Sequence, residues 1–158
     1  MTMEDLYHEI ILDHYKRPRH QAAELDGCDV HVHHTNPLCG DELDLRLRVE
    51  DGAIADVAFD GQGCSISMAS ASAMTEAVLG RDLSDADELA EVFRLMLHGE
   101  GVAREEDLLD AVAFEGVAQF PVRVKCALLG WMALRDAVTT VTDEVAAHTS
   151  PNGSAPSR

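Results

Sequence analysis

The fold of this chain is decided by the stretch Leu43-Asp44-Leu45-Arg46-Leu47-Arg48-Val49-Glu50-Asp51-Gly52. Apolar residues alternate strictly with charged ones in it, which predicts a β-strand with one buried face and one wet face. Asp51-Gly52 is a hairpin turn signal, so residues 54–59 are expected to return as the neighbouring strand. Residues 29–35 form another extended segment ahead of the Asn36-Pro37 turn. Together these segments predict a small three-stranded antiparallel sheet.

Helical patterns lie on both sides of this sheet in the sequence. Apolar spacing, capping residues and proline positions mark them. Helices are expected over 3–15, 67–79 and 84–98 and from Pro121 onward, and a short helix or helical turn over 105–113. The apolar period stops at Asp143, so residues 1–142 are expected to form a single domain and 143–158 a disordered tail. The predicted fold class is α+β, with the helices packed on one face of the sheet.

Composition narrows the possible partners and the compartment. The chain has 29 Asp and Glu residues against 12 Lys and Arg, a net charge of −17. Such a surface repels phosphate backbones, so no nucleic-acid binding is expected. No apolar run approaches the ~20 residues that cross a bilayer, and the first residues lack the marks of a signal peptide, so no membrane association is expected. We expect a cytoplasmic protein, in which the four cysteines are reduced and serve metal or sulfur chemistry rather than disulfides.

Three short motifs carry the candidate chemistry: Asn36-Pro-Leu-Cys-Gly-Asp41, Gly61-Gln-Gly-Cys-Ser-Ile-Ser67 and Arg123-Val-Lys-Cys126. They place three cysteines and one aspartate beside turns or helix starts, where a layered fold gathers its loops. Three thiolates and one carboxylate form a complete tetrahedral ligand set for zinc, and they can also hold a small iron–sulfur cluster. Helix starts favour thiolate over thiol, which predicts a lowered pKa for Cys64 and Cys126.

Spacing alone leaves other interpretations open. The chain has no Cys-x-x-Cys pair, and free cysteines are commonly small buried hydrophobes. Cys28 belongs to none of the motifs and is expected to be a buried or partly buried spectator. His31 and His33 share one strand face while His34 points away, so we expect a solvated strand face there rather than a metal cluster.

The motifs resemble those of the U-type iron–sulfur cluster assembly proteins, the family of the IscU scaffolds, of SufU and of the N-terminal part of NifU. The resemblance runs from about residue 4 to about residue 138. Lys125 precedes the third cysteine where the scaffold branch has a histidine. The segment between Cys64 and Cys126 is also long. Both features favour the SufU branch.

The resemblance implies one bound zinc ion with the ligands Cys39, Asp41, Cys64 and Cys126. It implies that Cys39 accepts persulfide sulfur from a SufS-type pyridoxal-phosphate cysteine desulfurase, with Arg123 supporting the active loop. Downstream SUF cluster-assembly proteins would then receive the sulfur. The function expected from this resemblance is that of a zinc-dependent sulfurtransferase in iron–sulfur cluster assembly.

Two alternatives stay open beside this function. One is a scaffold that assembles and transfers a [2Fe–2S] cluster, made labile by the hard oxygen ligand of Asp41; it would carry iron or a transient cluster instead of zinc. The missing histidine before Cys126 counts against it. The other is a binding protein with a purely structural zinc, although Cys39 on a glycine-flanked loop is unlike the rigid ligands of closed sites. A hydrolytic zinc enzyme fits poorly, because three thiolates leave no open position for water.

Overall fold

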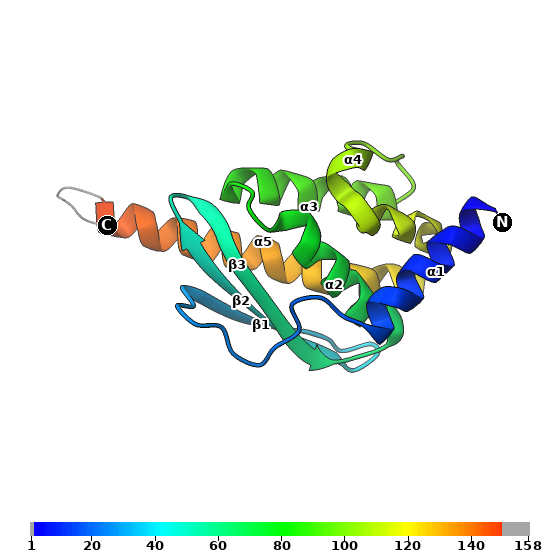
Figure 1. The fold of residues 1–158 in the computed structure, drawn as a ribbon, viewed down its shortest axis with the longest axis horizontal. Coiled ribbons are helices and arrows are strands. Elements are labelled where there is room, and N and C mark those ends of the chain that lie inside the picture. Colours follow the sequence, from blue (N-terminus) through cyan, green and yellow to red (C-terminus); the bar gives the residue numbers. More distant parts are fainter. Residues whose placement is uncertain (1, 150–158) are drawn as a thin grey trace.

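The computed structural model describes residues 2–149 and has the α+β architecture expected from the sequence (Figure 1). A three-stranded antiparallel sheet of order β1-β2-β3 is covered by helices. The elements are α1 (Met3–Lys16), β1 (Val30–Asn36), β2 (Asp41–Glu50), β3 (Ala53–Gln62), α2 (Ser65–Val78), α3 (Leu83–Leu97), α4 (Glu105–Leu108), the 3-10 helix η1 (Leu109–Gln119) and α5 (Pro121–Thr149).

The sheet confirms the alternation seen in the sequence. Leu43, Leu45 and Leu47 of β2 are fully buried, and the charged residues between them lie on the opposite, more open face. On that face, Asp44 Oδ1 lies 2.7 Å from His31 Nε2 and 3.2 Å from a ring nitrogen of the other β1 histidine on the same face. The expected solvated strand face is therefore confirmed.

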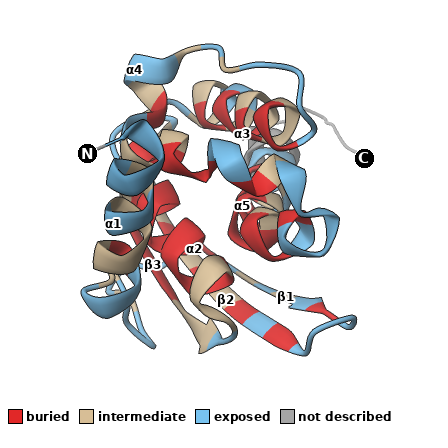
Figure 2. Ribbon diagram, turned by 90° about the vertical axis from the view of Figure 1, so that its right-hand side faces the viewer, coloured by how far each residue is buried: buried red, intermediate tan, exposed pale blue. Residues whose placement is uncertain are grey.

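The helices bury their apolar sides against the sheet and against one another (Figure 2). The helix α5 contacts β1 and β2, while α2 contacts both β3 and α5. Between α3 and α5, the rings of Phe93 and Trp131 stack at 4.4 Å with an interplanar angle of 11°. Along residues 2–149, no helix combines the length and the apolar character needed to cross a membrane.

Two predicted helix boundaries are wrong. The short helix or helical turn predicted over 105–113 has the wrong end, because the α-helical turn α4 stops at Leu108 and the chain continues as the 3-10 helix η1 as far as Gln119. The disordered tail predicted from Asp143 begins too early, because α5 continues to Thr149. Extending an existing helix requires no new nucleation, so it can continue where the apolar period stops. The rest of the predicted tail, residues 150–158, lies outside the described residues.

Glu91 ties α3 to α5 and gives the fold a pH-dependent contact. Hydrogen bonds from Arg94 (2.6 Å) and Arg135 (2.7 Å) lower the pKa of Glu91 from 4.5 to about 2. A carboxylate with a lowered pKa stabilises the fold above its unfolded-state pKa, and this contribution is lost as the pH falls through the folded-state value. Glu91→Gln is therefore expected to lower the Tm near neutral pH but not near pH 2.

Thermal unfolding of both proteins across this pH range tests the prediction. The two Tm curves should converge between about pH 4.5 and 2, the ordinary and folded-state pKa values of Glu91. A gap of constant size down to the lowest pH would contradict it.

Candidate metal centre

Cys39 lies at the tip of the hairpin that joins β1 to β2. Its loop, residues 37–40, is closed by the last strand pair, Asn36 with Asp41. The carbonyl of Asn36 accepts hydrogen bonds from the backbone N–H of Cys39 (3.2 Å) and of Gly40 (2.8 Å). Gly40 has a φ of +73°, the left-handed conformation in which glycine carries no steric penalty. The tight turn leaves Cys39 exposed and makes Asp41 the first residue of β2.

The helices α2 and α5 fix the positions of Cys64 and Cys126, respectively. Cys64 is the N-cap of α2, and its Sγ accepts the backbone N–H of Ser67 at 3.5 Å. Ser67 stands in the second motif, but sequence reasoning assigned it no role; its place three residues after the cap is the signal that could have identified it. Cys126 lies one turn further into α5 than expected, with its Sγ 3.7 Å from the carbonyl of Val122.

The carboxylate of Asp41 lies at the centre of the three thiols. Its Oδ2 is 3.1 Å from the Cys39 Sγ and 3.7 Å from the Cys64 Sγ, and its Oδ1 accepts the backbone N–H of Cys64 at 3.1 Å. The Cys39 and Cys126 sulfurs are 3.5 Å apart. The structure therefore brings Cys39, Asp41 and Cys126 together, while the Cys64 sulfur lies beside Asp41 but outside that group of three.

Gly63 allows this close approach. A Cβ at position 63 would lie 2.5 Å from Ser67 Oγ and 3.0 Å from the Asp41 carboxyl carbon. Because the Asp41 carboxylate and the start of α2 are both held in place, a larger residue would have to displace one of them. Glycine at this position is thus a requirement of the packed site.

The site stabilises the ionised form of the Asp41 carboxylate and the protonated form of the buried Cys126 thiol. Burial alone would raise the pKa of Asp41, but hydrogen bonds from the surrounding thiols, from Ser67 and from the Cys64 backbone lower it below its ordinary value. Burial raises the pKa of the Cys126 thiol, and the neighbouring sulfurs raise it further. The lowered pKa predicted for Cys126 is therefore wrong for the protein alone, because burial outweighs the helix start.

This donor set fits a zinc ion. In a tetrahedral site with Zn–S bonds of about 2.3 Å, neighbouring sulfurs lie about 3.8 Å apart. The ligand atoms of Cys39, Asp41 and Cys126 all lie within 4.8 Å of one another. The Cys64 sulfur, 3.7 Å from Asp41, would have to move closer to the other sulfurs to complete the set. Only a cation offsets the cost of deprotonating crowded, partly buried thiols. Asp41 and Cys126 are 2% and 3% exposed, so bulk water does not reach them.

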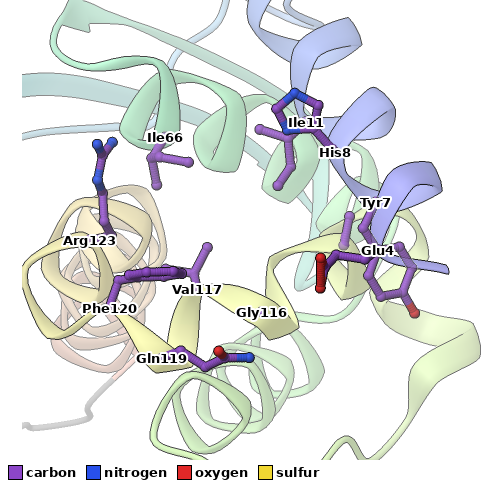
Figure 3. Close-up of a pocket in the computed structure, with 11 residues that line it drawn as sticks. Glu4, Tyr7, His8, Ile11, Ile66, Gly116, Val117, Gln119, Phe120 and Arg123 are labelled. Carbon is purple, nitrogen blue, oxygen red and sulfur yellow. The ribbon is translucent and has the colours of Figure 1, made fainter. Parts of the chain in front are cut away.

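The remaining candidate residues lie outside this cluster. Arg123 and Lys125 are both exposed on α5. Arg123 lines a pocket of about 570 Å³ between α1, η1 and α5, together with Ile66, which is two residues from Cys64 (Figure 3). Its supporting role stays a prediction. Cys28 is exposed, not buried as expected, and its thiol donates to the carbonyl of Val30.

Comparison with known proteins identifies the family. The model of the NifU-like N-terminal domain matches residues 6–127. The chain belongs to this family. The family match includes all three cysteine motifs entirely, so the resemblance to the U-type proteins is confirmed.

Of two similar relatives, one is named as a sulfurtransferase and the other as a scaffold protein. The zinc-dependent sulfurtransferase SufU of Bacillus subtilis (strain 168) is 41% identical over 137 residues, which cover 87% of this chain and 92% of that protein. The iron–sulfur cluster assembly scaffold protein IscU of Streptococcus pyogenes serotype M1 is 42% identical over 133 residues, covering 84% of this chain and 82% of the relative.

The fold agrees with solved members of the family. A candidate iron–sulfur cluster assembly scaffold protein for the SUF system from Fervidobacterium islandicum AW-1 superposes with a TM-score of 0.74 at 32% identity, covering 82% of this chain and 94% of the other.

Proposed function

We propose that this NifU-like domain is a zinc-dependent sulfur acceptor in iron–sulfur cluster assembly. The observation that carries the proposal is the unequal exposure of the four ligands. Cys39 is exposed at a hairpin tip, while its neighbours Asp41 and Cys126 are buried. A purely structural site would shield all of its ligands, whereas this one leaves Cys39 exposed to a partner.

The residues Cys39, Asp41, Cys64 and Cys126 would hold the ion. When bound, zinc supplies the positive charge that keeps the thiols deprotonated at neutral pH. The Cys39 thiolate would attack the outer sulfur of a persulfide on a SufS-type cysteine desulfurase. The sulfur–sulfur bond of that persulfide breaks, the desulfurase thiolate leaves, and the persulfide is carried by Cys39. Downstream SUF cluster-assembly proteins would then take this sulfur.

The surface beside Cys39 supports a protein partner. Leu38, next to Cys39, and Val122, at the start of α5, are each 73% exposed. The Val122 carbonyl lies 3.7 Å from the Cys126 sulfur, so both apolar residues belong to the surroundings of the cysteine cluster and suit a docking face that becomes covered. Arg123 lies in the same turn of α5 and would guide the partner's persulfide anion toward Cys39.

A scaffold for a [2Fe–2S] cluster is the second candidate. The central position of the Asp41 oxygen favours it, since one hard ligand among soft sulfurs weakens the hold on a cluster. The Streptococcus pyogenes relative is named as a cluster assembly scaffold protein, which also supports this candidate. Lys125, which cannot serve as a ligand while protonated, stands directly before Cys126 and argues for the sulfur acceptor.

The test is cysteine desulfurase turnover under anaerobic conditions, with the protein added once zinc-loaded and once stripped by a chelator. We expect only the zinc form to accelerate turnover, because the bound ion would keep the Cys39 thiol deprotonated at neutral pH. Readdition of one equivalent of zinc should restore the effect. If the stripped form instead takes up iron and sulfide and zinc blocks this uptake, the scaffold candidate replaces the sulfur acceptor.

A further inference from the structure

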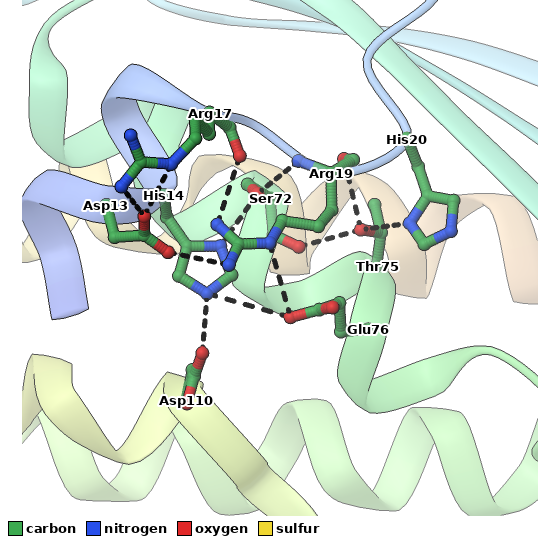
Figure 4. Close-up of polar contacts among 9 residues, drawn as sticks. All are labelled: Asp13, His14, Arg17, Arg19, His20, Ser72, Thr75, Glu76 and Asp110. Carbon is green, nitrogen blue, oxygen red and sulfur yellow. Dashed lines mark hydrogen bonds and ion pairs between the residues drawn. The ribbon is translucent and has the colours of Figure 1, made fainter.

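A second cluster of ligand-type side chains lies away from the cysteines. It consists of His14 on α1, Glu76 on α2 and Asp110 on η1 (Figure 4). One ligand atom from each lies within 4.8 Å of the other two. His14 Nε2 is 2.8 Å from Asp110 Oδ2 and 3.7 Å from Glu76 Oε1. We propose that these three side chains bind a divalent cation.

The spacing of the three atoms supports this proposal. Ligand atoms about 2.1 Å from an ion, at right angles or at tetrahedral angles, lie about 3.0 to 3.4 Å from one another. The two distances from His14 Nε2 bracket that range. One imidazole nitrogen with two carboxylates suits ions of intermediate hardness, namely Mn²⁺, Fe²⁺ or Zn²⁺, more than Ca²⁺ or Cu⁺.

His14 is held in a ligand's orientation. Its side chain is fully buried, and its Nδ1 lies 2.7 Å from Ser72 Oγ. The same hydroxyl oxygen accepts the backbone N–H of Arg19 at 2.7 Å. With the ion bound, Nδ1–H donates to Ser72 and Nε2 presents its lone pair to the carboxylates, the arrangement usual for metal-binding histidines. In the protein alone, Nε2 lies at hydrogen-bond distance from Asp110 Oδ2, 2.8 Å, and a bound ion would replace that hydrogen bond.

The two carboxylates give the cluster negative charge and leave it open to ions from solvent. The side chains of Glu76 and Asp110 are 37% and 44% exposed, so an ion can enter from solvent and retain water on that side. Arg19 is the nearest competing cation, with its Nε 3.9 Å from Glu76. Its guanidinium is bound more closely, at 2.6 Å, by Asp13. Glu76 and Asp110 therefore retain two negative charges facing His14.

The ion would join three elements that are distant in sequence. His14 and Asp110 are 96 positions apart, and Glu76 belongs to the helix that begins at the Cys64 cap. Binding would therefore raise the stability of the packing of α1 and η1 on α2, since an ion that binds only the folded state stabilises it.

Mn²⁺ titration tests the site, with free Mn²⁺ followed by electron paramagnetic resonance. The protein first receives one equivalent of zinc, because the thiolates prefer zinc and the hard Mn²⁺ then reports the oxygen and nitrogen site. We expect one Mn²⁺ per chain, and a loss of affinity of at least about tenfold in both Asp110→Asn and Glu76→Gln. Both substitutions preserve size on partly exposed side chains, so the fold should persist.

Asp136→Asn is the matched control. Asp136 also accepts from a histidine, at 2.9 Å, and its side chain is 50% exposed, but it lies outside the cluster. This variant should bind Mn²⁺ like the parent, and Mn²⁺ should raise the Tm of both but not that of Asp110→Asn. Absence of binding below millimolar Mn²⁺ would overturn the proposal, as would equal binding by all variants. Neither result depends on sulfur transfer, so the site is tested independently of the proposed function.

Discussion

Cys39→Ala is expected to abolish sulfur acceptance while leaving most of the zinc bound. The methyl group cannot attack a persulfide, so desulfurase turnover should fall to the rate of the desulfurase alone. Zinc should remain because Cys39 is the exposed ligand, and a water molecule can enter from solvent to take its place. Anaerobic turnover assays and metal analysis after gel filtration measure the two effects on the same preparation.

Cys28→Ala is the matched control for this experiment. Cys28 is also an exposed free thiol, but it lies outside the ligand cluster, so its removal should leave both turnover and zinc content unchanged. Persulfide found on Cys28, or sulfur acceptance retained by Cys39→Ala, would contradict the assignment of Cys39 as the acceptor.

Asp41→Ala is expected to lose zinc and, with it, sulfur acceptance. Asp41 is 2% exposed, so water cannot readily replace its carboxylate as it can replace the Cys39 thiolate. The substitution also deprives the Cys64 backbone N–H of its acceptor, which costs about 1–3 kcal/mol when such a group is buried. Together these losses should weaken zinc binding by at least about 100-fold, because removal of even an outer hydrogen-bond partner costs 10- to 100-fold.

Competition with a chromophoric zinc chelator measures this affinity. Asp44→Ala, on the same strand but on the wet face, is the control and should bind zinc normally. The Tm of the parent should rise on zinc addition, while that of Asp41→Ala should not. If Asp41→Ala bound zinc as tightly as the parent, the carboxylate would not be a ligand and the site would be a three-thiolate site.

Much of the fold was predictable because it depends on local patterns. The alternation from Leu43 to Val49 and the Asp51-Gly52 turn predict β2, the hairpin and the buried face, and the structure agrees. The four candidate ligands could be proposed from the sequence for a different reason. They sit in short motifs with a strong family resemblance, whereas their spacing alone left buried spectator cysteines equally open.

Features that depend on contacts between residues far apart in the sequence could not be predicted from local patterns. Nothing near His14 in the sequence indicates that it meets Asp110, since that contact exists only once α1 and η1 pack on α2. The raised pKa of Cys126 has the same origin, because the burial that causes it is a property of the assembled core. The exposure of Cys28 likewise follows from how the segment before β1 runs over the surface.

In the proposed sulfur transfer, the short hairpin loop would determine which molecule must move. Residues 37–40 are anchored at both ends by the Asn36–Asp41 pair, so even a fully stretched loop extends no more than about 9 Å from that anchor. Cys39 therefore cannot travel into a deep active site to collect sulfur. Under the proposed function, the donor would have to deliver its persulfide to the surface of this protein on a mobile arm of its own. The length of that arm, not any motion of this chain, would then limit which desulfurases can serve it.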